Sequence, residues 1–252
     1  MSGVAYLTEQ SPVVFAADAR AAGILGHPDL HVLCRHNARG TWPEIVEDVR
    51  AYVREHCIDL VVIDTADVWM LRPGDDPNDS VIAEAAVREA QRLAADGVAV
   101  CLLRHERKGG GDIADSGRGS SAFAGAVDAL LTLRRVSGSG HENRRELECV
   151  ARAALPDVSP KLVIELEGGH YVVKGDARDV ERQDTRAKIL EYLPTSREAA
   201  ITADELRENA GTAKTPTDDL LRDLVREGIA GREKGTGRAS PRAYGYWQQD
   251  DD

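Results

Sequence analysis

The sequence predicts an α/β protein with a doubly wound, mainly parallel sheet and a small winged helix-turn-helix domain near its C-terminal end. The α/β part rests on two observations. Strand-like apolar runs alternate with helical segments of about 10–15 residues, and the run from Cys57 to Thr65 is continuous and β-branched, as in a strand buried on both faces. The second domain rests on a change of pattern after residue 184, where three short helical segments precede a hairpin.

The first part of the chain supplies four strands and the helices between them. Val4–Glu9 predicts a strand, and Ser11 followed by Pro12 is typical of a helix start. Thr41 is expected to cap a helix whose apolar residues recur at helical spacing. The elements expected up to residue 103 are strands at 4–9, 31–36, 57–65 and 98–103 and helices at 12–22, 43–55 and 80–95.

A glycine-rich loop at residues 109–117 separates this part from the next strand, expected at Ala129–Leu133. The turn at residues 136–140 then predicts a hairpin, and Gly168-Gly169 predicts a second one. We expect these later strands to be antiparallel and to continue the same sheet at its edge. The domain boundaries that follow are 1–175 for the α/β core, 176–183 for a charged linker and 184–248 for the winged helix.

Composition limits the classes of function. The chain has 252 residues, 42% apolar and 30% charged, which suits a globular protein with a core. Its net charge of −11 argues against a protein that coats nucleic acid by charge alone. No apolar run approaches the length of a membrane span, and no export signal is recognisable. The four cysteines lie in strand-like runs without a metal-binding spacing, so reduced thiols and a cytoplasmic location are expected.

Polar residues follow three of the predicted strands at their carboxyl ends. Glu9 ends the first strand, Asp64 the third and His105 the fourth, and Arg118 comes after the glycine-rich loop. Ligands of open α/β sheets bind at the carboxyl edge of the strands. A carboxylate at the end of a buried strand is also where P-loop NTPases hold Mg²⁺. We therefore expect these four residues to gather in one crevice.

The same four segments resemble the RecA-like AAA ATPases, specifically the RepA-type hexameric replicative helicases. The matching pieces lie between residues 3 and 135 and are Tyr6-Leu7-Thr8-Glu9, Leu60-Val61-Val62-Ile63-Asp64-Thr65, His105-Glu106-Arg107-Lys108 and Arg118-Gly119-Ser120-Ser121-Ala122-Phe123 followed by Val127-Asp128. The resemblance implies ATP and Mg²⁺ as cofactors, DNA as partner and a homo-oligomeric ring.

The resemblance also implies a role for each residue. Glu9 would orient the attacking water, and Asp64 would bind Mg²⁺ with Thr65 beside it. His105 would sense the γ-phosphate. Arg118 would contact phosphate, either within its own subunit or across a subunit interface, and the sequence leaves that choice open. An arginine finger is worth about 10³–10⁵ in rate, so the choice matters.

The sequence departs from this family in one large respect, because no G-x-x-x-x-G-K-[ST] segment occurs in it. In the family, the strand before the phosphate loop is central and lies next to the strand that ends at His105. Without it, the sheet would expose two strand edges. Either the sequence is an N-terminally truncated fragment, which we favour, or its product is not a competent ATPase.

Two groups of basic residues are candidates for nucleic-acid contact. The resemblance to RecA-like rings implies that Arg107 and Lys108 would lie in a loop facing the central channel, through which single-stranded DNA passes. The hairpin carries the others, Arg232, Lys234, Arg238 and Arg242. Two other functions stay open. One is a non-enzymatic DNA-binding or regulatory protein in which the winged helix acts and the α/β domain is a vestigial scaffold. The other is a RecA-like accessory protein that binds nucleotide without turnover.

Overall fold

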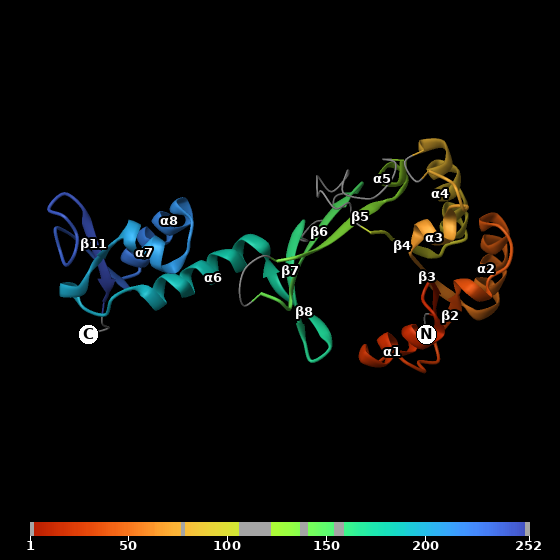
Figure 1. Ribbon diagram of the computed structural model, residues 1–252, viewed down its shortest axis with the longest axis horizontal. Coiled ribbons are helices and arrows are strands. Elements are labelled where there is room, and N and C mark those ends of the chain that lie inside the picture. The colour runs from red at the N-terminus through yellow and green to blue at the C-terminus, as the bar shows by residue number, and fades with distance from the viewer. Residues whose placement is uncertain (1–2, 77–78, 106–121, 137–140, 154–158, 250–252) are drawn as a thin grey trace. The chain divides into compact units, whose positions relative to one another are not determined.

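The computed structural model divides into two compact units, Met1–Val172 and Val173–Asp252 (Figure 1). The residues that it describes are 3–76, 79–105, 122–136, 141–153 and 159–249. None of the helices among these residues combines the length and the apolarity of a bilayer span.

A four-stranded parallel sheet forms the centre of the N-terminal unit, in the order β2-β1-β3-β4. Its strands are β1 (Gly3–Thr8), β2 (Leu30–Cys34), β3 (Ile58–Asp64) and β4 (Ala99–Leu103). Thr8 at the end of β1 lies opposite Asp64 at the end of β3. The residues that follow these two strands therefore emerge side by side, as the sequence predicted.

One face of this sheet packs against two long helices, α2 (Trp42–His56) and α4 (Ser80–Ala95), in a continuous apolar core. Val61 and Ile63 of β3 point into this core and are fully buried. A capping box fixes the start of α2, where Thr41 N donates to Glu44 Oε2 at 2.7 Å. Apolar periodicity and capping signals together explain why these helices form where the sequence predicted them.

The other face of the sheet is less covered than the sequence predicted. In β3, Asp59 is exposed, and buried and half-buried residues alternate from Val61 to Asp64, whereas a strand buried on both faces was expected. The helix α1 (Pro12–Ala21) reaches this face through Phe15, whose ring centroid is 5.2 Å from that of Tyr6. Most of the remaining apolar surface of α1 is exposed, with Val13 at 80%. The core is therefore one-sided.

A second difference concerns Cys57, which was expected to be the first residue of the strand at 57–65. In the structure it is the C-cap of α2 and precedes β3. Its φ of 53° is left-handed, and the residue is exposed. Of the other cysteines, Cys34 is buried, while Cys101 and Cys149 are half-buried. A left-handed residue is a common helix ending, and here it turns the chain directly into the strand.

The later strands form a sheet of their own, which contradicts the expectation that they continue the parallel sheet. They are β5 (Ala129–Arg135), β6 (Arg144–Ala151), β7 (Lys161–Glu167) and β8 (His170–Asp176), in the order β5-β6-β7-β8. A short helix, α5 (Ala122–Ala126), precedes β5. Among the described strands, β4 pairs with β3 alone and β5 with β6 alone, so each sheet ends in a strand with one open edge.

This antiparallel sheet has one mainly apolar face and one mainly charged face, although the register also places Arg145 on the first and the buried Val163 on the second. The register places Leu131 and Leu133 on the same face as Leu147, Cys149, Leu162 and Ile164, which we call the apolar face. The opposite, charged face holds ion pairs between neighbouring strands, including Lys161–Glu146 at 2.8 Å and Arg144–Glu165 at 3.1 Å. Leu131 is 64% exposed and Leu133 54% exposed.

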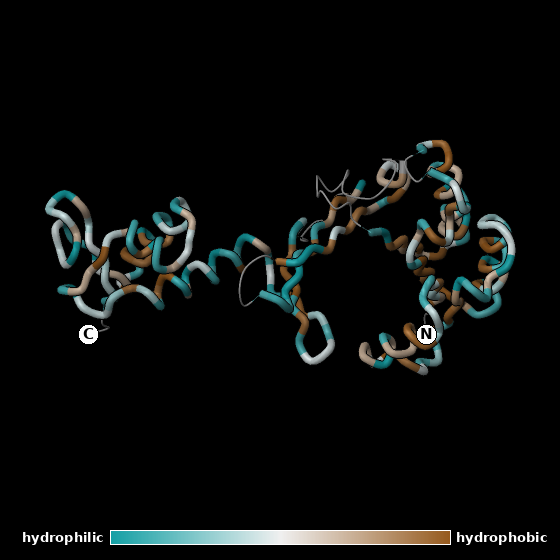
Figure 2. The backbone as a smooth tube through the Cα atoms, viewed as in Figure 1, coloured by the Kyte–Doolittle hydropathy of each residue, from teal (hydrophilic) through white to brown (hydrophobic). Residues whose placement is uncertain are grey.

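The C-terminal unit contains three helices and a small antiparallel sheet. The helices are α6 (Ala177–Tyr192), α7 (Ala203–Ala210) and α8 (Lys214–Arg226), and the strands are β9 (Ile201–Thr202), β10 (Ala230–Lys234) and β11 (Tyr244–Gln248), in the order β10-β11-β9. The segment 176–183, expected to be a linker, is the first half of α6. Figure 2 shows that α6 is mostly hydrophilic, which explains why composition alone suggested a linker.

Acidic residues within and just after α8 pair with arginines of α6. Arg186 lies 2.8 Å from Glu227, and Arg182 pairs with Asp223. Behind these pairs, Ile189, Leu206, Leu221 and Leu224 form a separate apolar core. The order of three helices and a hairpin is the predicted one, and its assignment as a winged helix stays a prediction.

Gly237 lies in the hairpin loop, close to the backbone of Ala200. Its φ is +62°, and a Cβ built on it would lie 2.2 Å from the carbonyl oxygen of Ala200. We expect Gly237→Ala to lower the free energy of unfolding by about 1–3 kcal/mol more than Gly228→Ala does. Gly228 has a φ of +78° but no atom within 4 Å of such a Cβ, so it isolates the left-handed strain. Urea unfolding followed by circular dichroism measures both, and equal losses would contradict the contact.

Candidate functional site

Glu9 and Asp64 meet at the carboxyl edge of the parallel sheet. The backbone N–H of Glu9 donates to the carbonyl of Asp64 at 2.8 Å. The hydroxyl of Thr65 donates to Oε2 of Glu9 at 2.9 Å, and Thr65 itself is buried. The peptide between Asp64 and Thr65 is cis. The structure thus brings together three of the residues that the sequence assigned to the site.

Tyr6 also belongs to this arrangement, although the sequence analysis gave it no role. Its hydroxyl donates to Oδ2 of Asp64 at 2.9 Å. Burial raises the pKa of Tyr6, and the hydrogen bond and the negative charge of Asp64 raise it further. The phenol therefore keeps its proton at neutral pH and remains a donor. A tyrosine two residues before the strand end was the only available signal for this contact.

Behind Asp64 lies a short helix that the sequence analysis missed, α3 (Ala66–Met70). Its Trp69 is 1% exposed, and the indole N–H donates to the carbonyl of Asp64 at 3.3 Å. The guanidinium of Arg35, which follows β2, lies 5.4 Å from the Trp69 ring centroid. With five residues, α3 has no helical period long enough to be recognised from the sequence.

Arg104 is a second residue that the sequence analysis passed over. It follows β4, and its guanidinium lies 2.9 Å from the carboxylate of Asp67 in α3 and 3.8 Å from the ring centroid of Phe123 in α5. This arginine therefore joins the end of β4 to both helices. Its neighbour His105 is exposed at the same edge, one residue further along. Arg107, Lys108 and Arg118 lie outside the described residues.

In the C-terminal unit, the hairpin residues Arg232 and Lys234 share a face with two tyrosines. Arg232 lies opposite Tyr246 and Lys234 opposite Tyr244 in the register of β10 and β11. The Arg232 guanidinium stacks 3.8 Å from the Tyr244 ring centroid. Glu233 points to the other face, where it accepts a hydrogen bond from Arg197 Nε at 2.7 Å. The acid within β10 thus lies on the face opposite Arg232 and Lys234.

The other two hairpin residues are also exposed. Arg238 and Arg242 lie in the loop between β10 and β11. The backbone N–H of Arg238 donates to the carbonyl of Ala200 at 2.8 Å, which fixes the base of that loop. The four cations that the sequence selected in this unit are therefore solvent-accessible on one hairpin.

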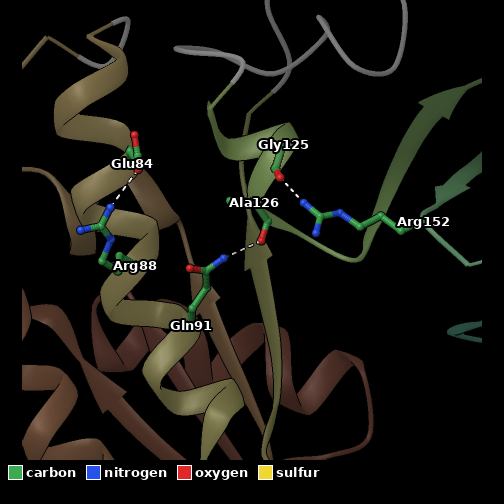
Figure 3. Close-up of a pocket in the computed structure, with 6 residues that line it drawn as sticks. All are labelled: Glu84, Arg88, Gln91, Gly125, Ala126 and Arg152. Carbon is green, nitrogen blue, oxygen red and sulfur yellow. Dashed lines mark hydrogen bonds and ion pairs between the residues drawn. The ribbon is translucent and has the colours of Figure 1, made fainter.

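A cavity of about 410 Å³ lies apart from these residues, between α4 and α5 (Figure 3). Two of its polar side chains donate hydrogen bonds to carbonyl groups at the end of α5. Gln91 Nε2 donates to the carbonyl of Ala126 at 2.9 Å, and Arg152 donates to that of Gly125. Arg88 pairs with Glu84 at 2.8 Å. These last carbonyls of a helix lack partners within it, so the cavity's side chains serve as its cap.

The residues at the sheet edge fit a divalent cation. Glu9, Asp64 and Thr65 offer oxygen atoms only, which suits Mg²⁺, an ion that usually takes one or two carboxylates together with water or phosphate. No cluster of three or more acidic, histidine or cysteine side chains occurs among the described residues. The sequence has no phosphate loop of the G-x-x-x-x-G-K-[ST] kind. The site therefore fits Mg²⁺ and does not by itself fit a nucleoside triphosphate.

Comparison with known proteins adds evidence about the fold. The sequence matches no protein-family model and no curated protein. The structure is similar to the crystal structure of a KaiC-like protein from the hyperthermophilic archaeon Pyrococcus horikoshii, with a TM-score of 0.55. The match covers 68% of this chain and 76% of that chain at 12% sequence identity. The likeness supports a RecA-like α/β fold for this chain.

Proposed function

We propose that the chain carries the scaffold of a RecA-like ATPase of the RepA helicase type, acting in DNA replication or on related DNA substrates. In this proposal Asp64 binds Mg²⁺, Glu9 orients the attacking water, and His105 and Arg118 respond to the γ-phosphate. The observation that carries it is the hydrogen-bonded arrangement of Glu9, Thr65 and Asp64 at the ends of two adjacent parallel strands. The carboxyl edge of a parallel sheet is the usual place for a ligand.

The open edge of β4 supports the same proposal. β4 consists of uncharged residues and lacks the charges, prolines or bulges that usually protect an edge strand. A parallel strand with a phosphate loop at its carboxyl end would pair there, and the loop would then lie at the same sheet edge as Asp64, with β4 between the new strand and β3. This placement would bring a triphosphate to the Mg²⁺-binding carboxylate. The proposed function also includes a cytoplasmic location and a homo-oligomeric ring that acts on DNA.

The given chain is expected not to hydrolyse ATP, because it has neither the backbone cradle nor the lysine that hold the β- and γ-phosphates. A phosphate-release assay with Mg²⁺, with and without single-stranded DNA, measures this. The matched control is Asp64→Ala, which removes the cation-binding carboxylate. Phosphate release that disappears in Asp64→Ala would show genuine turnover and would contradict the prediction.

A second candidate function is favoured by the hairpin. A basic face that also presents tyrosines suits contact with DNA phosphates and bases. The chain would then be a non-enzymatic winged-helix DNA-binding or regulatory protein, and its α/β unit a vestigial scaffold. In a winged helix, α8 would be the helix that enters the major groove. Acidic residues in and just after α8 form ion pairs with α6 and would repel DNA phosphates, so DNA contact is assigned to the hairpin instead. DNA binding without any effect of Mg²⁺ or nucleotide would favour it over the ATPase scaffold.

A further inference from the structure

Tyr6 lies next to the proposed cation-binding residues on the same face of the sheet. In the register of β1 and β3, Tyr6 is opposite Val62, and Thr8 is opposite Asp64. Side chains two residues apart along a strand share a face, and diagonal neighbours on adjacent strands come within reach of a long side chain. The phenol of Tyr6 spans this diagonal, which puts its hydroxyl 2.9 Å from Oδ2 of Asp64.

The direction of this hydroxyl is set by packing. The Tyr6 ring is partly buried and inclined at 53° to the ring of Phe15 in α1, with 5.2 Å between centroids. A phenol has one O–H donor and an ionised carboxylate only accepts, so the hydroxyl of Tyr6 donates to Oδ2 of Asp64. Because packing against Phe15 holds the Tyr6 ring, the hydrogen bond from Tyr6 restrains the rotation of the Asp64 side chain.

A matching contact restrains the second carboxylate. Thr65 donates to Oε2 of Glu9, just as Tyr6 donates to Oδ2 of Asp64. Within the described part of the chain, no hydrogen bond engages the remaining oxygen of either group. Each carboxylate is thus held through one oxygen by a neutral hydroxyl, while its other oxygen stays available.

We propose that Tyr6 is a positioning residue, which holds Oδ2 of Asp64 so that Oδ1 is presented to a divalent cation or to its bound water. The inference rests on the proposed function, since it takes Asp64 as the cation-binding carboxylate. A phenylalanine at this position keeps the ring against Phe15 and loses only the hydrogen bond. Groups that orient metal ligands in this way typically change metal affinity about 10–100-fold.

Binding of Mn²⁺ to the full chain, measured by electron paramagnetic resonance of the free ion, tests the proposal. We expect Tyr6→Phe to weaken Mn²⁺ binding about tenfold, and Asp64→Asn to abolish it. Tyr52→Phe is the matched control, because it removes a tyrosyl hydroxyl that lies 2.7 Å from His31 Nδ1 instead of from the site. It should leave the affinity unchanged. Phe15→Leu, which loosens the Tyr6 ring and keeps its hydroxyl, should weaken binding to a smaller extent.

The outcomes separate this inference from the proposed function. Equal affinity in Tyr6→Phe and the unaltered chain, with loss in Asp64→Asn, overturns the role of Tyr6 and leaves the cation site standing. A chain that binds no Mn²⁺, or binds it independently of Asp64, overturns the cation site and with it the role of Tyr6. Thermal unfolding of each variant separates positioning from stability: a tenfold loss of affinity at an unchanged midpoint supports positioning, and a loss that follows the midpoint overturns it.

Discussion

Trp69→Ala is expected to lower the free energy of unfolding of the N-terminal unit by about 3–5 kcal/mol. Trp69 is among the largest fully buried side chains, and it packs into the core below the carboxyl edge of the sheet. The substitution removes most of an aromatic side chain from a close-packed interior and leaves a cavity. It also removes the indole donor to the carbonyl of Asp64. Urea unfolding followed by circular dichroism measures the loss.

Trp69→Phe distinguishes the two contributions, because it keeps most of the packing and loses the indole N–H. We expect a smaller loss, with about 0.5–1.5 kcal/mol of it due to the hydrogen bond. The carbonyl of Asp64 keeps its bond from the backbone of Glu9 in either variant. A loss below about 1 kcal/mol in Trp69→Ala would mean that this side chain is not part of the core.

If the hairpin binds DNA as proposed, the double variant Arg232→Ala/Lys234→Ala should weaken this binding about tenfold to a hundredfold at low salt. If both cations contact phosphates, the slope of log affinity against log salt concentration should become shallower by about two. Both side chains are exposed on one face of the hairpin, and Arg232 is held in place by its stack on Tyr244. Fluorescence anisotropy with labelled single- and double-stranded oligonucleotides over a range of salt concentrations measures affinity and slope together.

The matched control for the hairpin removes the same charge from α8. Arg222 and Arg226 are exposed, but each pairs with an aspartate three residues earlier, Asp219 and Asp223 respectively. Arg222→Ala/Arg226→Ala should therefore leave the salt slope nearly unchanged. Equal losses in the two double variants would mean that the total charge of the unit matters and that the hairpin face has no special role.

The sequence predicted the elements of the parallel sheet well because their signals are local. Ser11 with Pro12, the capping box at Thr41, and the apolar periodicity of the two long helices each act within a few residues. The convergence of Glu9 and Asp64 also followed from local information. All strands of a parallel sheet end at the same edge, whereas the strand order that makes β1 and β3 neighbours was not predicted.

The errors arose where the outcome depends on partners distant in the chain. Apolar alternation in β5 and β6 predicts strands, but it cannot tell which sheet they join, and they form a separate one. The start of α6 was predicted to be a linker because its composition is hydrophilic. Its helix is supported by contacts with α7 and α8, which composition does not indicate. Tyr6 and Arg104 lie within reach of Asp64 and Asp67 only after folding, and neither residue type signals such a contact in advance.

The two faces of the antiparallel sheet bear on how stability varies with temperature. On its apolar face, Leu131 and Leu133 are already largely hydrated in the native state, so unfolding adds little apolar surface there. Newly exposed apolar surface is what makes the heat capacity of unfolding large and positive, while newly exposed polar surface lowers it. The ion-paired groups on the charged face contribute in the lowering sense. This sheet should therefore give a heat-capacity increment below the usual 12–15 cal/mol/K per residue, and a correspondingly flat stability curve.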